Sequence, residues 1–294
     1  DRVLTQRFAD MPLKSCRYGL MLNAQGGVKD DLVVFRLAVN RWMLVVNAGT
    51  MESDAAHIQE CLSDRRAFQN VSDDIVKLDV QGPRSRDVLR VLIPGIEKLD
   101  YYTFDEFCAL GQNMIVSRTG YTGELGYEIY GPADAVRSCW QRLLESGVMP
   151  AGLGVRDVLR LEMGYPLYGH ELSETMSPLE AGLGKFMDWE KDFIGKEAVG
   201  LEKARGVRRK NVMILSDSRR APRAGHSVFT EDGREIGVLT SGTFSPAFKK
   251  GVGLALVQTE HSQAGQRVAF GEKTSQSSAV IVRRPVYQQG SLKQ

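Results

Sequence analysis

Near residue 203 the hydrophobic pattern of the chain changes. Beyond this point the apolar residues fall in short alternating runs, such as KNVMILS at 210–216, GVGLALV at 251–257 and QRVAFG at 266–271, with turn signals between them. Short alternating runs with frequent turns are typical of a small antiparallel barrel or sandwich. We therefore predict a C-terminal antiparallel β-barrel domain over residues 203–294.

Before residue 203, strand and helix patterns are mixed. Residues 18–47 hold three apolar runs divided by turn signals, which predicts three strands. Helical periodicity follows at 51–67, 133–147 and 154–164. A chain of 294 residues suggests about two domains. We therefore predict a body of class α+β over residues 1–202, followed by the barrel.

The composition argues against several classes of protein. The net charge of +2 lacks the basic excess of a nucleic-acid-binding protein. No apolar run approaches the roughly 18 residues that span a bilayer. The four cysteines form no Cys-x-x-Cys pair and the four histidines are far apart, so we predict neither a disulfide framework nor a metal site. We expect reduced thiols in a cytoplasmic protein, or in its mitochondrial-matrix equivalent, with no nucleic-acid or membrane partner.

Two aspartates begin the apolar part of the stretch QGGVKDDLVVF, residues 25–35. Asp is disfavoured in strands, and carboxylates are seldom buried without a partner. In a strand, Asp31 would share a face with Val33 and Asp30 with Leu32, because neighbouring side chains point to opposite faces. Alternatively, both lie in the turn after residues 26–27 and one caps backbone amides. The sequence leaves both interpretations open.

A glycine-rich segment, RTGYTGELGYEIY, covers residues 118–130. Its glycines permit tight turns and close approach of a ligand, but their spacing matches neither a P-loop nor a dinucleotide fingerprint. Glu128 follows in a predicted strand. Its carboxylate could accept paired hydrogen bonds from an amidine-like edge, such as that of an aminopyrimidine ring. The alternative is an exposed strand glutamate.

The segment AGLGVRDVLRLE, residues 151–162, places a Gly-x-Gly before a predicted helix. A Gly-x-Gly in this position can belong to a dinucleotide-binding fingerprint. Here, however, it follows Met149-Pro150 instead of a strand, and Asp157 stands where the fingerprint needs its third glycine. We therefore reject dinucleotide binding for this segment. Arg156 and Arg160 are four residues apart and share a helix face. Arg156 could grip a ligand carboxylate with its planar guanidinium. The alternative is that Asp157 or Glu162 pairs with either arginine.

Together and in this order, eight segments resemble the aminomethyltransferase family, which comprises the T-protein of the glycine cleavage system and its folate-binding relatives. They are MLNAQGGVKDDLVV, LVVNAG, QGP, SRTGYTGELGYEI, PAGLGVRDVLRLEMGYPLYGHEL, SPLEAGLGKF, DFIGKEA and GVLTSGTFSP with the later GVGLALV. The resemblance implies two interleaved mixed α/β domains around a central folate channel, plus the C-terminal barrel. It also implies a one-carbon transferase that takes an aminomethyl group from the lipoyl arm of H-protein, releases ammonia and delivers the carbon to tetrahydrofolate.

The resemblance also implies roles for particular residues. Asp31 would be catalytic, facing the channel while Asp30 does not, and its carboxylate would steer the accepting folate amine and take up its proton. Glu128 would hold the pterin and Arg156 the glutamate tail. The implied cofactor-binding residues are Tyr18, Asn47, Tyr121, Glu128 and Arg156.

The sequence departs from the family pattern in three places. Phe35 stands where many relatives have Tyr, and GHEL at 169–172 replaces a more acidic segment. Relatives also carry several dozen residues before the first motif, so we expect an N-terminal segment to be missing here. These differences affect the predicted identity of the one-carbon donor more than the predicted binding of folate.

Two other functions of the same superfamily are possible. One is a folate-dependent demethylase of a small N-methyl or S-methyl compound. The other is a non-catalytic folate-binding iron–sulfur maintenance protein, but those relatives carry a Cys in a KGCYTGQE-like motif, where this chain reads RTGYTGE at 118–124.

A basic cluster near the domain boundary is either a solvated linker or a docking surface for an acidic partner. Its members are Lys203, Arg205, Arg208, Arg209, Lys210, Arg219, Arg220 and Arg223. The resemblance names the partner as lipoylated H-protein, bound transiently. We expect the enzyme itself to be a monomer or a weak dimer.

Overall fold

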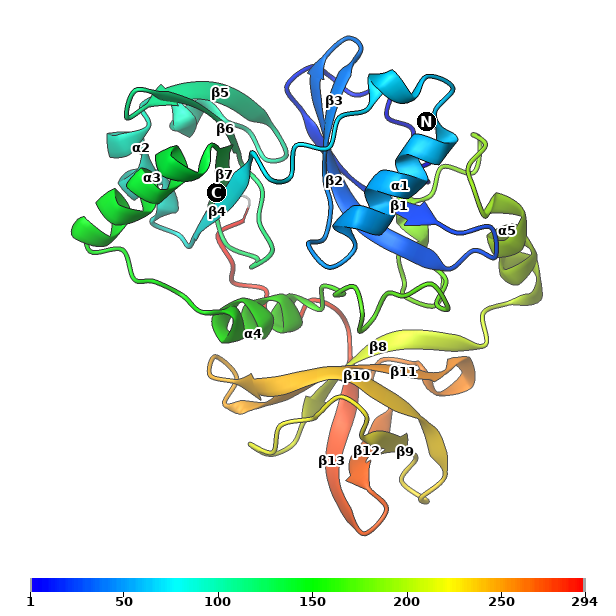
Figure 1. Cartoon of the computed structure of the whole chain (residues 1–294). Helices are drawn as coiled ribbons and strands as arrows, with labels where there is room; N and C mark the ends of the chain where they lie inside the picture. Colours follow the sequence, from blue (N-terminus) through cyan, green and yellow to red (C-terminus); the bar gives the residue numbers. More distant parts are fainter. Residues whose placement is uncertain (1, 293–294) are drawn as a thin grey trace. The chain divides into compact units, whose positions relative to one another are not determined.

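The computed structural model describes residues 2–292 (Figure 1). The chain forms two compact units, each assembled from segments that are far apart in the sequence. Unit 1 comprises Asp1–Gln6, Leu20–Asp31 and Asp157–Gln288. Unit 2 comprises Arg7–Gly19, Leu32–Arg156 and Gln289–Gln294. Both units therefore draw on the N-terminal part of the chain.

The first sheet has three strands in the order β1-β2-β3, namely β1 (Cys16–Leu22), β2 (Val28–Ala38) and β3 (Arg41–Val45). The three strands predicted over residues 18–47 are therefore confirmed. Helix α1 (Met51–Cys61) follows. Burial alternates along β2, so that Asp30, Leu32 and Val34 are buried while Asp31 and Val33 are half-buried. This alternation follows from the pleat, which turns successive side chains to opposite faces.

The second sheet lies within unit 2 and has the order β4-β7-β6-β5. Its strands are β4 (Val76–Gln81), β5 (Phe104–Ala109), β6 (Gln112–Ser117) and β7 (Gly126–Gly131). Helices α2 (Ser85–Leu92) and α3 (Ala133–Glu145) pack on one face through a core that includes Val80, Leu89, Ile129 and Cys139 (Figure 1). The residues that alternate with this core in β4 and β7 therefore point to the opposite face.

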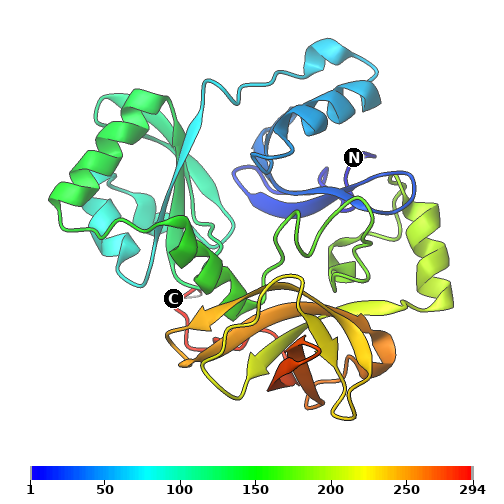
Figure 2. The same cartoon turned by 60° about the horizontal axis from the view of Figure 1, so that its bottom comes forward.

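The C-terminal strands close into an antiparallel barrel in the order β10-β11-β8-β13-β12-β9 (Figure 2). They are β8 (Arg209–Ser216), β9 (Ser227–Phe229), β10 (Glu235–Ser245), β11 (Lys250–Gln258), β12 (Arg267–Glu272) and β13 (Ser275–Val282). Aliphatic side chains and Phe270 fill its interior. The predicted α+β class and C-terminal barrel are confirmed. The folate channel and the division between residues 202 and 203 stay predictions.

Two further helices are α4 (Leu153–Met163) and α5 (Lys196–Arg205). Short 3₁₀ helices occupy Arg65–Ala67, Ile96–Lys98, Gly184–Phe186 and Thr259–His261. Within residues 2–292, no helix has both the length and the apolar character that crossing a membrane requires.

In unit 1, the buried side chain of Arg160 connects α4 to the barrel. It donates hydrogen bonds to Asp157 at 2.8 Å, to Glu171 at 2.8 Å and to the Ser241 hydroxyl of β10 at 2.8 Å. Glu171 is fully buried and also accepts a hydrogen bond from the backbone N–H of Leu167 at 3.1 Å. Outside the pair itself, Asp157, Ser241 and the backbone N–H of Leu167 thus supply three hydrogen-bond partners for these buried charges.

Candidate functional site

Glu128 occupies the face of the second sheet that the helices leave uncovered. It alternates with Tyr127 and Ile129, which belong to the core under α2 and α3. Its carboxylate is buried and accepts hydrogen bonds from the hydroxyls of Thr119 and Tyr130, the latter at 3.0 Å, on Oε2. The interpretation of Glu128 as an exposed strand glutamate is therefore wrong.

Lys77 completes the surroundings of this carboxylate. Its Nζ donates to Glu128 Oε1 at 2.7 Å and lies 3.6 Å from Asp79 Oδ2. Burial on its own raises the pKa of Glu128, but the charge of Lys77 and the hydrogen bonds that Glu128 receives outweigh it and lower the pKa to about 2. Glu128 is thus an ionised, buried acceptor at neutral pH.

Asp79 lies directly opposite Glu128 in the register of β4 and β7. Burial raises the pKa of Asp79 to about 6, and the neighbouring Glu128 adds to the rise, while Lys77 and Arg156 oppose it. Two carboxyl groups with such different pKa values can hold one proton between them in mildly acidic solution.

Sequence reasoning missed Lys77 and Asp79, although a signal was present. The strand VKLDVQ at 76–81 carries a polar side chain at every second position, Lys77, Asp79 and Gln81. Such a period places all three on one face of a strand. We define the Glu128 cluster as Lys77, Asp79, Thr119, Glu128 and Tyr130.

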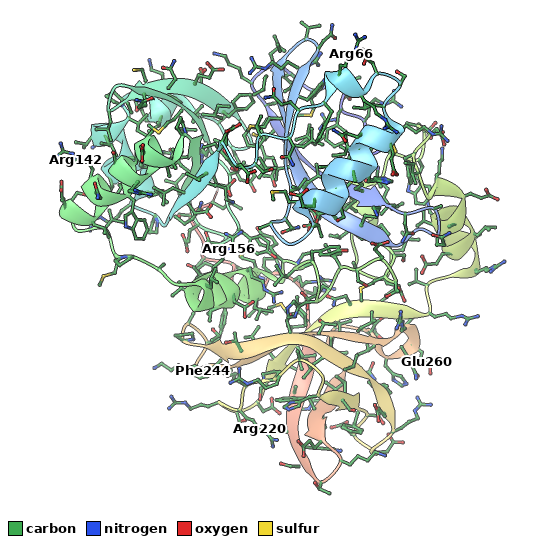
Figure 3. All side chains as sticks on the ribbon, in the orientation of Figure 1. Arg66, Arg142, Arg156, Arg220, Phe244 and Glu260 are labelled. Carbon is green, nitrogen blue, oxygen red and sulfur yellow. The ribbon has the colours of Figure 1, made fainter. Side chains whose placement is uncertain are left out.

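Arg156 and Tyr121 adjoin this cluster within unit 2. Arg156, on α4 (Figure 3), places its guanidinium carbon 4.8 Å from the centroid of the Tyr121 ring and Nη1 3.4 Å from Asp79 Oδ2. Its side chain remains 40% exposed. The alternative that Asp157 or Glu162 pairs with one of the two arginines therefore holds for Arg160, which pairs with Asp157, and not for Arg156. Three of the predicted binding residues are therefore brought together, namely Tyr121, Glu128 and Arg156.

Gln81 fixes the loop that carries Tyr121. Its side-chain Nε2 donates to the carbonyl oxygens of Thr119 at 3.2 Å and Tyr127 at 3.4 Å. A Cβ on Gly126 would lie 1.8 Å from Gln81 Oε1, and one on Gly120 would lie 2.2 Å from it. Gly120 and Gly126 therefore leave the space that the side-chain amide of Gln81 occupies, and any larger residue at either position would clash with it.

The two remaining binding residues, Tyr18 and Asn47, are half-buried and also belong to unit 2. Asp31 is the last residue of a segment of unit 1. Both aspartates lie in β2, so the alternative that they belong to a turn is wrong. Asp30 is fully buried and Asp31 is the more accessible of the two, on the opposite face of the strand. The catalytic role of Asp31 stays a prediction.

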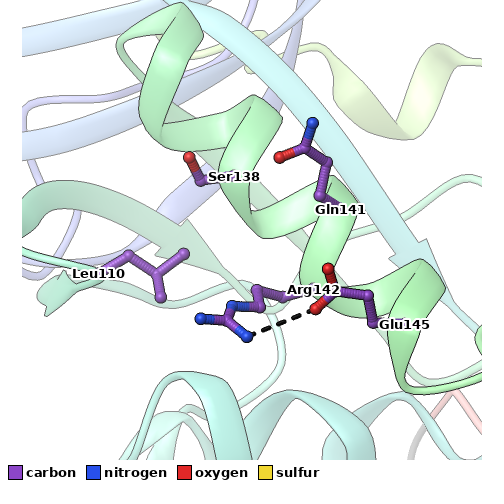
Figure 4. A pocket seen from close by; sticks show the side chains of 5 residues that line it. All are labelled: Leu110, Ser138, Gln141, Arg142 and Glu145. Atoms are coloured by element: carbon purple, nitrogen blue, oxygen red, sulfur yellow. Dashed lines mark hydrogen bonds and ion pairs between the residues drawn. The ribbon is translucent and has the colours of Figure 1, made fainter.

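Two cavities in unit 2 are lined by none of the six predicted residues. One, of about 410 Å³, is lined by Leu110 and by polar residues of α3, including Arg142 and Glu145, which pair at 3.4 Å (Figure 4). The other, of about 500 Å³, lies among β3, α1 and residues 67–75. Across the described part of the chain, no group of His, Cys, Asp or Glu side chains has the arrangement of a metal site.

Comparisons with known proteins agree on one family. A family model described as the GCVT N-terminal domain matches residues 1–191, and one described as the glycine cleavage T-protein C-terminal barrel domain matches residues 209–288. An aminomethyltransferase of Pseudothermotoga lettingae is 40% identical over 298 aligned positions, covering 100% of this chain and 82% of that protein. One of Moorella thermoacetica is 41% identical, covering 92% of this chain and 75% of that protein.

A solved structure gives the same result. The crystal structure of glycine cleavage system aminomethyltransferase T from Bartonella henselae superimposes with a TM-score of 0.89 at 30% identity. The match covers 99% of this chain and 81% of that one.

Proposed function

The chain belongs to the glycine cleavage T-protein family of aminomethyltransferases, and we propose that it moves a one-carbon unit from aminomethyl-lipoyl H-protein to tetrahydrofolate with release of ammonia. The observation that supports this most is the Glu128 cluster. It presents a buried carboxylate that stays ionised at neutral pH, next to an accessible arginine and a tyrosine ring.

The charged and aromatic side chains brought together in unit 2 fit the chemistry of tetrahydrofolate. A reduced pterin offers adjacent N–H donors on its aminopyrimidine edge, which suit an ionised carboxylate such as Glu128. The glutamate tail carries carboxylates, which suit the planar guanidinium of Arg156. We assign Tyr121 to the pterin ring and Tyr18 and Asn47 to the walls of the pocket.

Tetrahydrofolate would supply the amines that receive the carbon. The work left to the protein is to orient the accepting amine, to take up its proton and to stabilise positive charge on the one-carbon unit. A carboxylate at Asp31 can do all three, and its place within the paired strand β2 gives it a rigid support.

A donor panel tests this proposal. Purified protein is incubated under anaerobic conditions with tetrahydrofolate and either aminomethyl-loaded H-protein or small N-methyl and S-methyl compounds. We expect methylenetetrahydrofolate and ammonia in equal amounts from loaded H-protein alone. Turnover of small donors only would show the alternative demethylase, and binding of folate without turnover would fit the maintenance protein.

Glu128→Gln should weaken the binding of tetrahydrofolate. The amide is close to isosteric but uncharged, so the ligand loses hydrogen bonds to an ionised acceptor, each contributing about 1.5–3 kcal/mol. We expect the Kd to rise about ten- to hundredfold in a titration calorimeter. Glu145→Gln, a change at a side chain that is 65% exposed on α3, is the matched control and should bind as the wild type does. Equal Kd values for the two variants would exclude Glu128 from the pterin site.

The basic cluster of residues 203–223 includes residues near both ends of β8. Arg208 directly precedes β8, Arg209 is its first residue and Arg219 lies beyond its end. The eight residues of this strand span roughly 25 Å. Arg209 pairs with Glu180 at 2.8 Å. The guanidinium carbon of Arg219 lies 5.2 Å from the ring centroid of Phe244, a residue labelled in Figure 3. Arg208 is exposed. We therefore propose Arg208 as the cleaner probe of H-protein docking.

Replacing Arg208 by Gln should raise the apparent KM for H-protein about two- to fivefold at low salt. A rim charge acts mainly on association with an acidic partner, so raising the ionic strength should abolish the difference. Arg142→Gln removes an exposed arginine from unit 2 and serves as the control. An unchanged KM at every salt concentration would leave Arg208 as a linker residue.

A further inference from the structure

Asp79 lies among three charged groups of the candidate site. Its Oδ2 is 3.6 Å from Lys77 Nζ and 3.4 Å from Arg156 Nη1. Glu128 faces it across the β4–β7 pairing, where the Cβ atoms of opposed residues are about 4.5–5.5 Å apart. Asp79 therefore touches both parts of the site, the carboxylate proposed for the pterin and the arginine proposed for the tail.

The second oxygen of Asp79 indicates where a proton would reside. Oδ1 is covered by protein atoms and accepts no hydrogen bond from a donor among residues 2–292. Two carboxylates that face each other repel, and a proton on one of them turns the contact into a hydrogen bond. Since Glu128 already receives three donors, Asp79 is the partner that takes the proton.

Protonation changes what Arg156 can do. An ionised Asp79 attracts the guanidinium at 3.4 Å, whereas a neutral Asp79 no longer holds it by charge. We propose that Asp79 is a positioning residue that competes with the carboxylate of a bound ligand for Arg156, and that protonation of Asp79 releases the guanidinium. This inference rests on the proposed function, in which Arg156 holds the glutamate tail.

The other groups around Asp79 do not titrate in the same range. Lys77 lies on β4, the same strand as Asp79. Burial lowers the pKa of Lys77, but the charges of Glu128 and Asp79 raise this pKa by more. Tyr130, on β7, has its pKa raised by burial and by Glu128. Cys16, on β1, has its pKa raised by the same two causes. With Glu128 ionised throughout, the pKa of Asp79, about 6, governs the site between pH 5.5 and 7.5.

Two probes separate the tail from the pterin. Tetrahydrofolate and 6-methyltetrahydropterin share the reduced pterin, and only tetrahydrofolate carries the tail. The Kd of 6-methyltetrahydropterin divided by the Kd of tetrahydrofolate therefore reports the contribution of the tail. The tail carboxylates are ionised above about pH 5. In the wild type we expect this ratio to be about three- to twentyfold larger at pH 5.5 than at pH 7.5, the range that linkage to one proton allows. In Asp79→Asn the ratio should be independent of pH and at least as large as the low-pH value of the wild type.

A measurement without ligand tests the titration itself. Because Asp79 has a higher pKa in the folded state than its ordinary value of 3.8, the wild type should lose stability as the pH rises from about 4 to 6. The Tm of Asp79→Asn minus the Tm of the wild type should therefore increase as the pH rises over that range. Asp134→Asn, a change at a side chain that is 98% exposed, should show the wild-type behaviour in both measurements.

The outcomes are distinct. A tail contribution that depends on pH equally in Asp79→Asn and the wild type, or a Tm difference that does not change with pH, overturns the role of Asp79 and leaves the proposed function standing. A folded wild type that binds no tetrahydrofolate at any pH overturns the proposed function, and the inference with it.

Discussion

Asp31→Asn is expected to lower kcat about 10²- to 10⁴-fold, the usual contribution of a positioned general base. The amide keeps the shape of the side chain but cannot take up a proton or stabilise positive charge. Binding should change little, because the proposed contacts to the pterin and the tail come from Glu128 and Arg156. Single-turnover formation of methylenetetrahydrofolate from aminomethyl-loaded H-protein measures the rate, and calorimetry measures the Kd.

Asp30 offers the matched control for this experiment. It is the neighbouring aspartate and is fully buried on the other face of β2. Asp30→Asn should lower the Tm more than Asp31→Asn does, while the single-turnover rate of its folded fraction stays near that of the wild type. Undiminished turnover in Asp31→Asn would remove Asp31 from the mechanism, and a large loss of rate in Asp30→Asn would move the role to its neighbour.

Arg160→Met is expected to cost about 3–5 kcal/mol of the free energy of unfolding, the range for breaking a buried ion pair. Arg160 is 1% exposed and Glu171 is fully buried, so the substitution leaves an uncompensated carboxylate inside unit 1. It also removes hydrogen bonds to Ser241 of the barrel and to Asp157. Urea denaturation, with a check that the m-value is unchanged, measures the loss.

The exposed pair Arg142–Glu145 on α3 provides the comparison (Figure 4). Both side chains are about two-thirds exposed, at 64% and 65%, and lie 3.4 Å apart. Arg142→Met should therefore change the free energy of unfolding by less than about 0.5 kcal/mol. If Arg160→Met cost as little, the buried network would contribute nothing to the attachment of α4.

Much of the fold follows from local patterns. The alternating runs after residue 203 predict the barrel, and the runs within 18–47 predict strands that match β1, β2 and β3. Period-two alternation also places Asp30 and Asp31 on opposite faces of one strand, as observed. The family resemblance selects Glu128 and Arg156, and the structure brings both together with Tyr121.

Other features of the candidate site depend on contacts between distant segments. Lys77 and Glu128 are 51 residues apart, and nothing local to either stretch indicates that β4 lies beside β7. The identity of the buried arginine on α4 was equally hidden, because Arg156 and Arg160 share a helix face in the sequence pattern. Only Arg160 meets a buried carboxylate, Glu171.

The sequence by itself determined which elements form and which side chains share a face of each element. That information is contained in the repeat of the backbone, 2.0 residues in a strand and 3.6 in a helix. The tertiary structure decided which face is covered, which strand lies opposite Asp79 and hence which carboxyl group has its pKa raised by burial. The reason is that burial and charge at a site depend on neighbours that are close in space, and the backbone repeat carries no information about residues dozens of positions away.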